Sequence, residues 1–183
     1  MKVLGIVGSP RKGGNTEILV ERVLAGASKA GAEVELFRLN ELDIKGCQGC
    51  NYCQENERCR QQDDMQKIYD ELFSADAVVI GSPIYISYVT AQTKIFLDRL
   101  YALLKVGEGS RLPAGKKCVL VYSQGGGNDG RKVMESLAAF FKGAFGMDVK
   151  AIIGDNNLNP LGAVNERKDV LQRAFEVGEA LVR

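Results

Sequence analysis

Histidine is absent from the 183-residue sequence, and so is tryptophan. Without histidine the chain cannot build a Ser-His-Asp triad, a Cys-His nucleophile pair, a histidine-ligated zinc site or a Rieske-type cluster. Long apolar runs are missing as well, since none reaches the roughly 20 residues that a membrane-spanning helix needs. The net charge is only +1, so the composition does not point to a nucleic acid or an acidic surface as partner.

The sequence opens on a short apolar run, Val3–Val7, with no stretch before it that could serve as a signal peptide. We therefore expect a cytoplasmic protein with reduced thiols. A length of 183 residues suits one α/β domain, and no repeat or low-complexity segment divides it. We expect a single domain over residues 1–183, with a cysteine-rich insertion at about 39–63.

Five short strand patterns alternate with amphipathic helical patterns along the chain, and the second of them, Glu33–Arg38, alternates between polar and apolar residues as an edge strand does. We expect strands at 3–7, 33–38, 77–81, 117–122 and 148–153. We expect helices at 17–24, 64–73, about 90–104, 131–145 and 165–182. Regular alternation of this kind is typical of an α/β fold with a doubly wound parallel sheet. With five strands, we expect the flavodoxin-like order 2-1-3-4-5.

In such a sheet, ligands bind beyond the carboxyl ends of the strands, beside the first strand. The loops at that place follow the first, third and fourth strands. These three loops are the ones rich in Gly, Ser, Asn, Gln and Tyr. This coincidence is the strongest indication in the sequence of a ligand site.

The segment Gly8–Thr16, with the sequence GSPRKGGNT, joins the first strand to the first helix. Ser9, Asn15 and Thr16 offer polar side chains, Arg11 adds positive charge, and Asn15 or Thr16 can cap the helix. Because backbone N–H groups at a helix N-terminus favour an anion, we interpret the segment as a phosphate cradle. It matches neither a Walker A loop nor the dinucleotide fingerprint, and the alternative is an ordinary polar turn.

The loops after the third and fourth strands suit a flat aromatic ligand better than a second phosphate. The first carries no charge and has the candidate residues Ser82, Pro83, Ile84 and Tyr85. The second has the candidate residues Ser123, Gln124 and Gly125. Its glycines fit a Gly-x-Gly-x-x-Gly pattern, but after the wrong strand, so we expect close approach of the backbone to a ring instead of a dinucleotide site.

The most specific signal is a compact run of four cysteines, Cys47, Cys50, Cys53 and Cys59. Closely spaced thiolates suit an iron–sulfur cluster, and the longer last gap lets Cys59 fold back onto the same cluster. Zinc sites usually use two separated pairs. We therefore favour an iron–sulfur cluster, then empty or oxidised thiols, then zinc. Cys118, in the fourth strand, is interpreted as a buried core thiol.

Together these motifs resemble the iron–sulfur flavoproteins, within the NAD(P)H-dependent FMN reductase group of flavodoxin-like proteins. The resemblance covers nearly the whole chain. It rests on Gly8–Thr16, Cys47–Cys59, Asp63–Met65, Ser82–Tyr85, Ala91–Lys94 with Asp98 and Arg99, and Ser123–Gly126.

The resemblance implies bound FMN, with its phosphate held through Ser9, Arg11, Asn15 and Thr16. It further implies that Pro83, Ile84 and Tyr85 lie along the isoalloxazine, with Ser123, Gln124 and Gly125 at its other edge. It implies a [4Fe–4S] cluster on the four cysteines. Finally, it implies homodimers or homotetramers in which the cluster and the flavin of different subunits approach each other.

A flavin takes up two electrons and a cluster carries one, so we expect an oxidoreductase that passes electrons from a donor to an acceptor. The donor would be NAD(P)H or reduced ferredoxin, and the acceptor a quinone, oxygen, peroxide or an electron carrier. No catalytic acid, base or nucleophile is expected. The alternatives are an NAD(P)H-dependent FMN or quinone reductase with empty cysteines, and a flavin-loaded sensor or partner-binding module without turnover.

The expected helix at 90–104 has little polar surface. We expect it at a contact between subunits, the alternative being burial within one chain.

Overall fold

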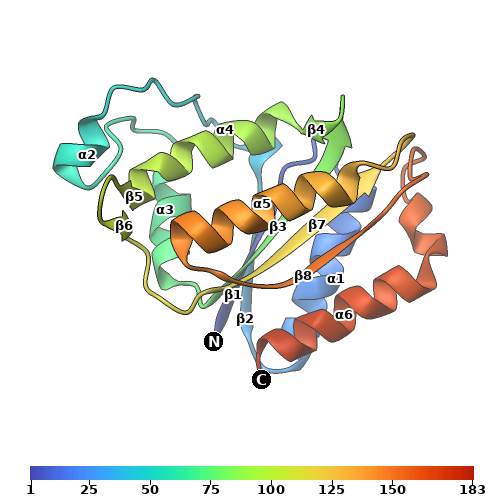
Figure 1. The fold of residues 1–183 in the computed structure, drawn as a ribbon. Helices are drawn as coiled ribbons and strands as arrows, with labels where there is room; N and C mark the ends of the chain where they lie inside the picture. Colours follow the sequence, from blue (N-terminus) through green and yellow to red (C-terminus); the bar gives the residue numbers. More distant parts are fainter.

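The computed structural model describes residues 1–183 and shows a parallel sheet between two layers of helices (Figure 1). The five long strands pair in parallel in the order β2-β1-β3-β7-β8. They are β1 (Lys2–Val7), β2 (Glu33–Arg38), β3 (Ala77–Tyr85), β7 (Lys117–Gln124) and β8 (Asp148–Asp155). The expected α/β fold with a parallel sheet is confirmed, and the strand order is consistent with the expected 2-1-3-4-5.

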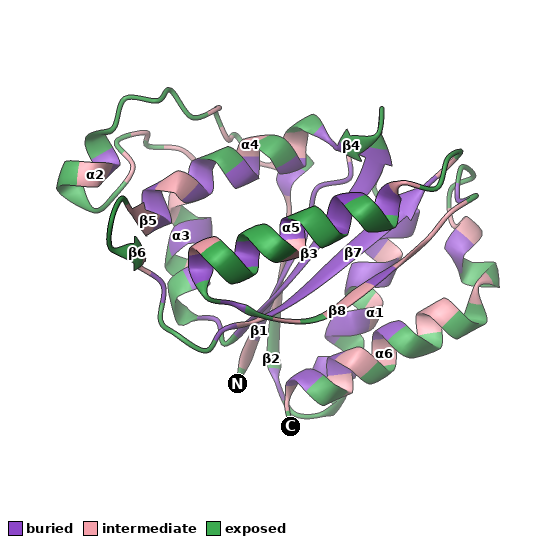
Figure 2. Ribbon diagram, in the orientation of Figure 1, coloured by how far each residue is buried: buried purple, intermediate pink, exposed green.

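Helices cover both faces of the sheet (Figure 1). On one face lie α1 (Asn15–Lys29) and α6 (Lys168–Leu181), and on the other α3 (Met65–Ser74), α4 (Ala91–Arg99) and α5 (Gly130–Phe145). Side chains of β1 alternate between the two cores: Val3 and Val7 join the core with α1 and α6, whereas Leu4 and Ile6 join the other. The central strands β1, β3 and β7 are almost fully buried (Figure 2), which is why the first strand is an uninterrupted apolar run, whereas the edge strands β2 and β8 are partly exposed.

The expected helix at 90–104 is shorter in the structure. α4 ends at Arg99 and continues as a 3-10 turn, η2 (Leu100–Leu103), and a small hairpin of β5 (Leu104–Lys105) and β6 (Gly109–Ser110). Phe96 and Leu100 are buried in the core of the same chain, so burial within one chain accounts for the apolar composition. No helix of the structure has both the length and the apolar composition that crossing a membrane requires.

The remaining elements are short. They are η1 (Leu39–Glu41), α2 (Tyr52–Asn56), β4 (Tyr88–Val89) and η3 (Ala163–Glu166). β4 pairs antiparallel with the end of β3. The segment 39–63, which carries η1 and α2, lies outside the sheet, and α2 is at the opposite end of α4 from β4 (Figure 1).

The first helix begins earlier than the sequence indicates. Its N-cap is Gly14, which leaves Asn15 and Thr16 inside the first turn, so the expectation that one of them caps the helix is wrong. Glu17 partly takes over this role, because its carboxylate accepts a hydrogen bond of 2.8 Å from the N–H of Gly13.

Helices α1 and α6 pack closely because each has a glycine at the contact. A Cβ atom on Gly26 of α1 would lie 2.0 Å from the carbonyl oxygen of Phe175. A Cβ atom on Gly178 of α6 would lie 1.9 Å from the carbonyl oxygen of Val23. Both distances are far below contact distance, and both obstacles are rigid backbone, so any side chain forces the helices apart.

We predict that Gly178→Ala lowers the free energy of unfolding by about 1–3 kcal/mol, although alanine favours a helix, because the added methyl group has no space. The matched control is Gly143→Ala in α5, where a Cβ would meet nothing within 4 Å. That variant should be neutral or gain up to about 1 kcal/mol. Denaturant unfolding of both variants checks the prediction, which fails if they are equally stable.

Candidate functional site

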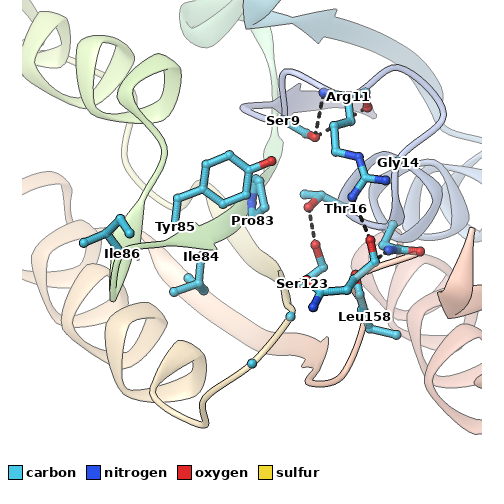
Figure 3. Close-up of a pocket in the computed structure, with 14 residues that line it drawn as sticks. Ser9, Arg11, Gly14, Thr16, Pro83, Ile84, Tyr85, Ile86, Ser123 and Leu158 are labelled. Carbon is cyan, nitrogen blue, oxygen red and sulfur yellow. Dashed lines mark hydrogen bonds between the residues drawn. The ribbon is translucent and has the colours of Figure 1, made fainter. Parts of the chain in front are cut away.

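A cavity of about 340 Å³ opens at the carboxyl ends of β1, β3 and β7 (Figure 3). This volume lies in the range of small-molecule sites. It is lined by the loop after β1 with the first turn of α1, by the ends of β3 and β7 with the residues that follow them, and by the loop after β8. The segment 82–85, expected as a loop, is therefore the end of strand β3. The lining residues are Ser9, Arg11, Gly14, Asn15, Thr16, Pro83, Ile84, Tyr85, Ile86, Ser123, Gly125, Gly126, Leu158 and Asn159.

The structure brings most of the candidate cofactor residues together around this cavity. Ser82 and Gln124 are the exceptions. Ser82 Oγ donates to the carbonyl of Pro83 and accepts from the N–H of Thr90. The carboxamide of Gln124 accepts from the N–H of Gly130 and donates to Asp129. These two buried side chains therefore shape the loops instead of facing the cavity.

The segment before α1 offers polar hydrogen atoms to the cavity. The N–H groups in the first turn of a helix have no helical partner and carry partial positive charge. Ser9 Oγ accepts from the N–H of Arg11 at 3.1 Å, which tightens the loop. The hydroxyls of Thr16 and Ser123 lie 2.7 Å apart and join the first turn of α1 to the end of β7. In Figure 3, Arg11 and this hydroxyl pair lie along the same side of the cavity.

A buried ion pair adjusts the charge at this helix N-terminus. Glu17 is 3% exposed, and its carboxylate would repel an anion. Arg38, from the end of β2, donates from Nε to Glu17 at 2.6 Å. This hydrogen bond raises the pKa of Arg38, so the guanidinium stays charged and cancels the carboxylate. The cradle thus keeps the positive character supplied by Arg11 and the helix.

The loop after β8 closes the cavity, and the sequence analysis missed it. The carboxamide of Asn15 donates to the carbonyls of Leu158 and Pro160, both at 2.8 Å, and accepts from the N–H of Val164. Arg11 Nη1 donates to the carbonyl of Asn159 at 2.9 Å. The side chain of Asn15 is thereby committed to holding this loop. The polar stretch around Pro160, at the same edge of the sheet, was the signal that could have indicated it.

A strained hairpin tip borders the cavity on the side of β3. Ile86 and Ser87, between β3 and β4, have φ angles of +47° and +57°. Two positive values make the tight turn that a two-residue hairpin requires, but they are costly for a β-branched residue such as Ile86. Ile86 is 99% exposed, while Tyr85 is half-exposed and lines the cavity. Such strain is a common property of functional sites.

The four clustered cysteines line a second, smaller cavity of about 20 Å³, together with Arg99 and Tyr101. Cys47 and Cys50 are exposed, Cys53 is buried, Cys59 is half-buried, and none forms a disulfide. No three His, Cys, Asp or Glu side chains are close enough to hold a metal ion in this conformation. The thiols therefore surround one cavity without converging on a point within it.

Cys118 differs from these four, as expected. It is fully buried in β7, and burial raises the pKa of its thiol to about 12. The thiol is therefore neutral and part of the core.

Helix α4 runs from the loop after β1 to the cysteine segment. At its start, Thr90 Oγ1 donates to the carbonyl of Gly8 at 2.6 Å, beside the anion cradle. The approach is so close that a Cβ on Gly8 would lie 1.8 Å from Thr93 Oγ1. At its end, Arg99 lines the cysteine cavity. Nine residues of helix span about 13 Å, and the two cavities share no lining residue.

Comparisons with known proteins agree with this architecture. A family model described as NADPH-dependent FMN reductase matches residues 1–153. An iron–sulfur flavoprotein of Methanocaldococcus jannaschii is 34% identical over 86% of this chain and 78% of its own length. A second iron–sulfur flavoprotein of the same organism is 31% identical over 97% of this chain and 96% of its own.

Solved structures show the same fold. The NAD(P)H:quinone oxidoreductase from Methanothermobacter marburgensis has a TM-score of 0.76 at 21% identity, covering 100% of this chain and 98% of that one. An FMN-dependent NADH-azoreductase from Bacillus anthracis, in complex with FMN, has a TM-score of 0.72 at 15% identity, with complete coverage of both chains. At these identities the likeness concerns the flavodoxin-like fold alone. The family match and the curated relatives go further: the chain belongs to the NADPH-dependent FMN reductase family and, within it, to the iron–sulfur flavoproteins, and it is a flavin-dependent oxidoreductase.

Proposed function

We propose that this protein binds FMN in the cavity beyond β1, β3 and β7 and a [4Fe–4S] cluster at its four clustered cysteines. Its reaction would be electron transfer from NAD(P)H or reduced ferredoxin to a quinone, oxygen, peroxide or an electron carrier. When bound, the flavin supplies two-electron chemistry and the cluster one-electron chemistry. The observation that supports the proposal is that one cavity lies at the N-terminus of α1, which favours an anion, while all four clustered thiols line a second cavity beside the end of α4.

The residues around the larger cavity fit FMN. The hydroxyls of Ser9 and Thr16, the first-turn N–H groups and Arg11 would hold the phosphate. Pro83 and Tyr85 would pack along the ring, which has a flat apolar face. One anion cradle with no second nucleotide-binding half favours FMN over FAD. The chain's contribution is then to orient the ring and to shield one side of it from water.

The donor set around the smaller cavity fits an iron–sulfur cluster, because four free thiols surround one space and no histidine competes. Cys47, Cys50, Cys53 and Cys59 would hold it. The cavity of about 20 Å³ requires the thiols to rearrange when metal enters. Their exposure agrees with that requirement, since Cys47 and Cys50 lie on a surface loop.

We also propose that residues 1–183 act as one domain with the insertion at 39–63, and that the chain forms homodimers or homotetramers. The exposed apolar tip beside the larger cavity supports association, because Tyr85, Ile86 and Tyr88 together leave apolar area in water.

We predict that Arg11→Ala weakens FMN binding by about tenfold, because a charge-assisted hydrogen bond to the phosphate is lost. Fluorescence titration with FMN and with riboflavin checks this, since riboflavin lacks the phosphate and its affinity should not change. The control is Lys12→Ala, which removes an equal charge from a side chain that pairs with Glu41 outside the cavity. Equal losses for FMN and riboflavin would contradict the cradle assignment.

We predict that Tyr85→Ala shifts the visible absorbance of bound flavin and weakens binding of both FMN and riboflavin, because Tyr85 contacts the ring and not the phosphate. Tyr88→Ala is the matched control, since Tyr88 pairs with Tyr85 in the hairpin and is equally exposed, at 44%, but does not line the cavity. An unchanged spectrum in Tyr85→Ala, or an equal change in both variants, would place the ring elsewhere.

The cluster proposal predicts about four iron and four acid-labile sulfide atoms per chain after anaerobic reconstitution, because a cubane held by four thiolates has this composition. Cys50→Ser should lose them, and Cys118→Ala should retain them. Metal and sulfide analysis measures both. If wild-type protein takes up no iron, or binds one zinc ion tightly instead, the cluster proposal fails and an FMN reductase without an iron–sulfur cluster is left.

A further inference from the structure

Arg99, the last residue of α4, is the largest side chain that is fully buried in this protein. Nη1 and Nη2 donate to the two carboxylate oxygens of Asp63 at 2.5 and 3.0 Å. Nη1 also donates to the carbonyl of Lys45 at 2.7 Å, and Nε to the hydroxyl of Tyr69 at 3.3 Å. Asp63 is itself 2% exposed. The pair is therefore bidentate, dry and held from several sides.

Lys45 and Asp63 are the two ends of the cysteine segment. All four clustered cysteines lie between them in the sequence. One guanidinium thus binds both ends of the segment at once. The carboxylate of Asp63 adds to this closure by accepting from the N–H of Lys45 at 3.1 Å. Asp43 and Asp64 are also joined, by two hydrogen bonds of 2.7 and 3.1 Å.

We call the point where Lys45 and Asp63 meet the neck of the cysteine segment. No cysteine side chain takes part in closing it, so the neck is fixed without any metal. A buried ion pair is not in itself a good source of stability, because desolvation offsets much of the attraction between the charges. Apolar side chains could fill the same space. The use of two charges at this point, in a residue that lines the cysteine cavity, indicates a role beyond packing.

We propose that Arg99 is the positioning residue of the cysteine segment: with Asp63 it holds the neck between Lys45 and Asp63 closed before metal binds, and its charge raises the reduction potential of the cluster. The second part rests on the proposed function. A cluster with four thiolate ligands is anionic and gains one more negative charge on reduction. A fixed cation beside it favours the reduced state, whereas Asp63 has the opposite effect.

Limited trypsin digestion of the metal-free full-length protein tests the first part, because Lys45, Arg58 and Arg60 are cleavage sites in or at the end of the segment. Arg99→Gln should be cut there about tenfold faster than wild type, since local opening becomes easier. The control is Asp98→Asn, which removes an exposed ion pair with Lys94 from the same helix. Equal cleavage rates in Arg99→Gln and the control would overturn the neck closure.

Arg99→Gln leaves Asp63 as an unpaired buried charge and could unfold the chain. Thermal unfolding by circular dichroism detects this. In that case the double variant Asp63→Asn/Arg99→Gln, which buries no charge, replaces it in the digestion. Faster cleavage of the segment in a double variant that melts cooperatively supports the closure, and cleavage at the wild-type rate refutes it.

Potentiometric titration of reconstituted protein tests the second part. The midpoint potential of the cluster should fall in Arg99→Gln and rise in Asp63→Asn, while Asp98→Asn leaves it unchanged. Shifts of the midpoint potential in opposite directions indicate an effect of charge. A loosened loop would shift the midpoint potential of both variants in the same direction. Shifts of equal sign, or none, would overturn this part.

The digestion and the potentiometric titration together distinguish a failure of this inference from a failure of the proposed function. If wild-type protein binds no cluster, the proposed function and the effect on potential both fail, while the digestion still decides whether Arg99 closes the neck. If the cluster forms and the variants behave like Asp98→Asn, the proposed function stands and the inference fails.

Discussion

The parallel pairing of β1 between β2 and β3 is the constraint on which the rest of this structure depends. Val7 pairs with Gly81 on one side and with Arg38 on the other. Because parallel strands share a direction, the segments that follow all emerge at one edge of the sheet. The anion cradle, the hairpin at Tyr85 and the start of the cysteine segment therefore begin within one small region.

Helix α4 lies between two segments that both begin at this edge of the sheet, the loop after β1 and the cysteine segment. Its first end is bonded to the cradle through Thr90 and the carbonyl of Gly8. Its last residue, Arg99, is bonded to both ends of the cysteine segment. A helix of nine residues is stiff and about 13 Å long, so it holds the loop after β1 at one end and the cysteine segment at the other. A surface loop with little regular structure is thereby given a defined place.

An ion pair with a buried carboxylate lies near each of the two cavities. Glu17 with Arg38 lies behind the cradle, and Asp63 with Arg99 lies beside the thiols. Each pair is neutral as a whole, which limits the cost of burial.

The sequence by itself determined the features that depend on local pattern. Short apolar or alternating segments indicated the strands, the Gly8–Thr16 segment indicated the cradle, and the spacing from Cys47 to Cys59 indicated the thiol cluster. Only the tertiary structure decided the roles that depend on partners far along the chain. Asn15 bonds to Leu158 across 143 positions, and Arg99 reaches Lys45 across 54. Periodicity describes which way a side chain faces within its own element, and it carries no information about which distant backbone will be folded against it.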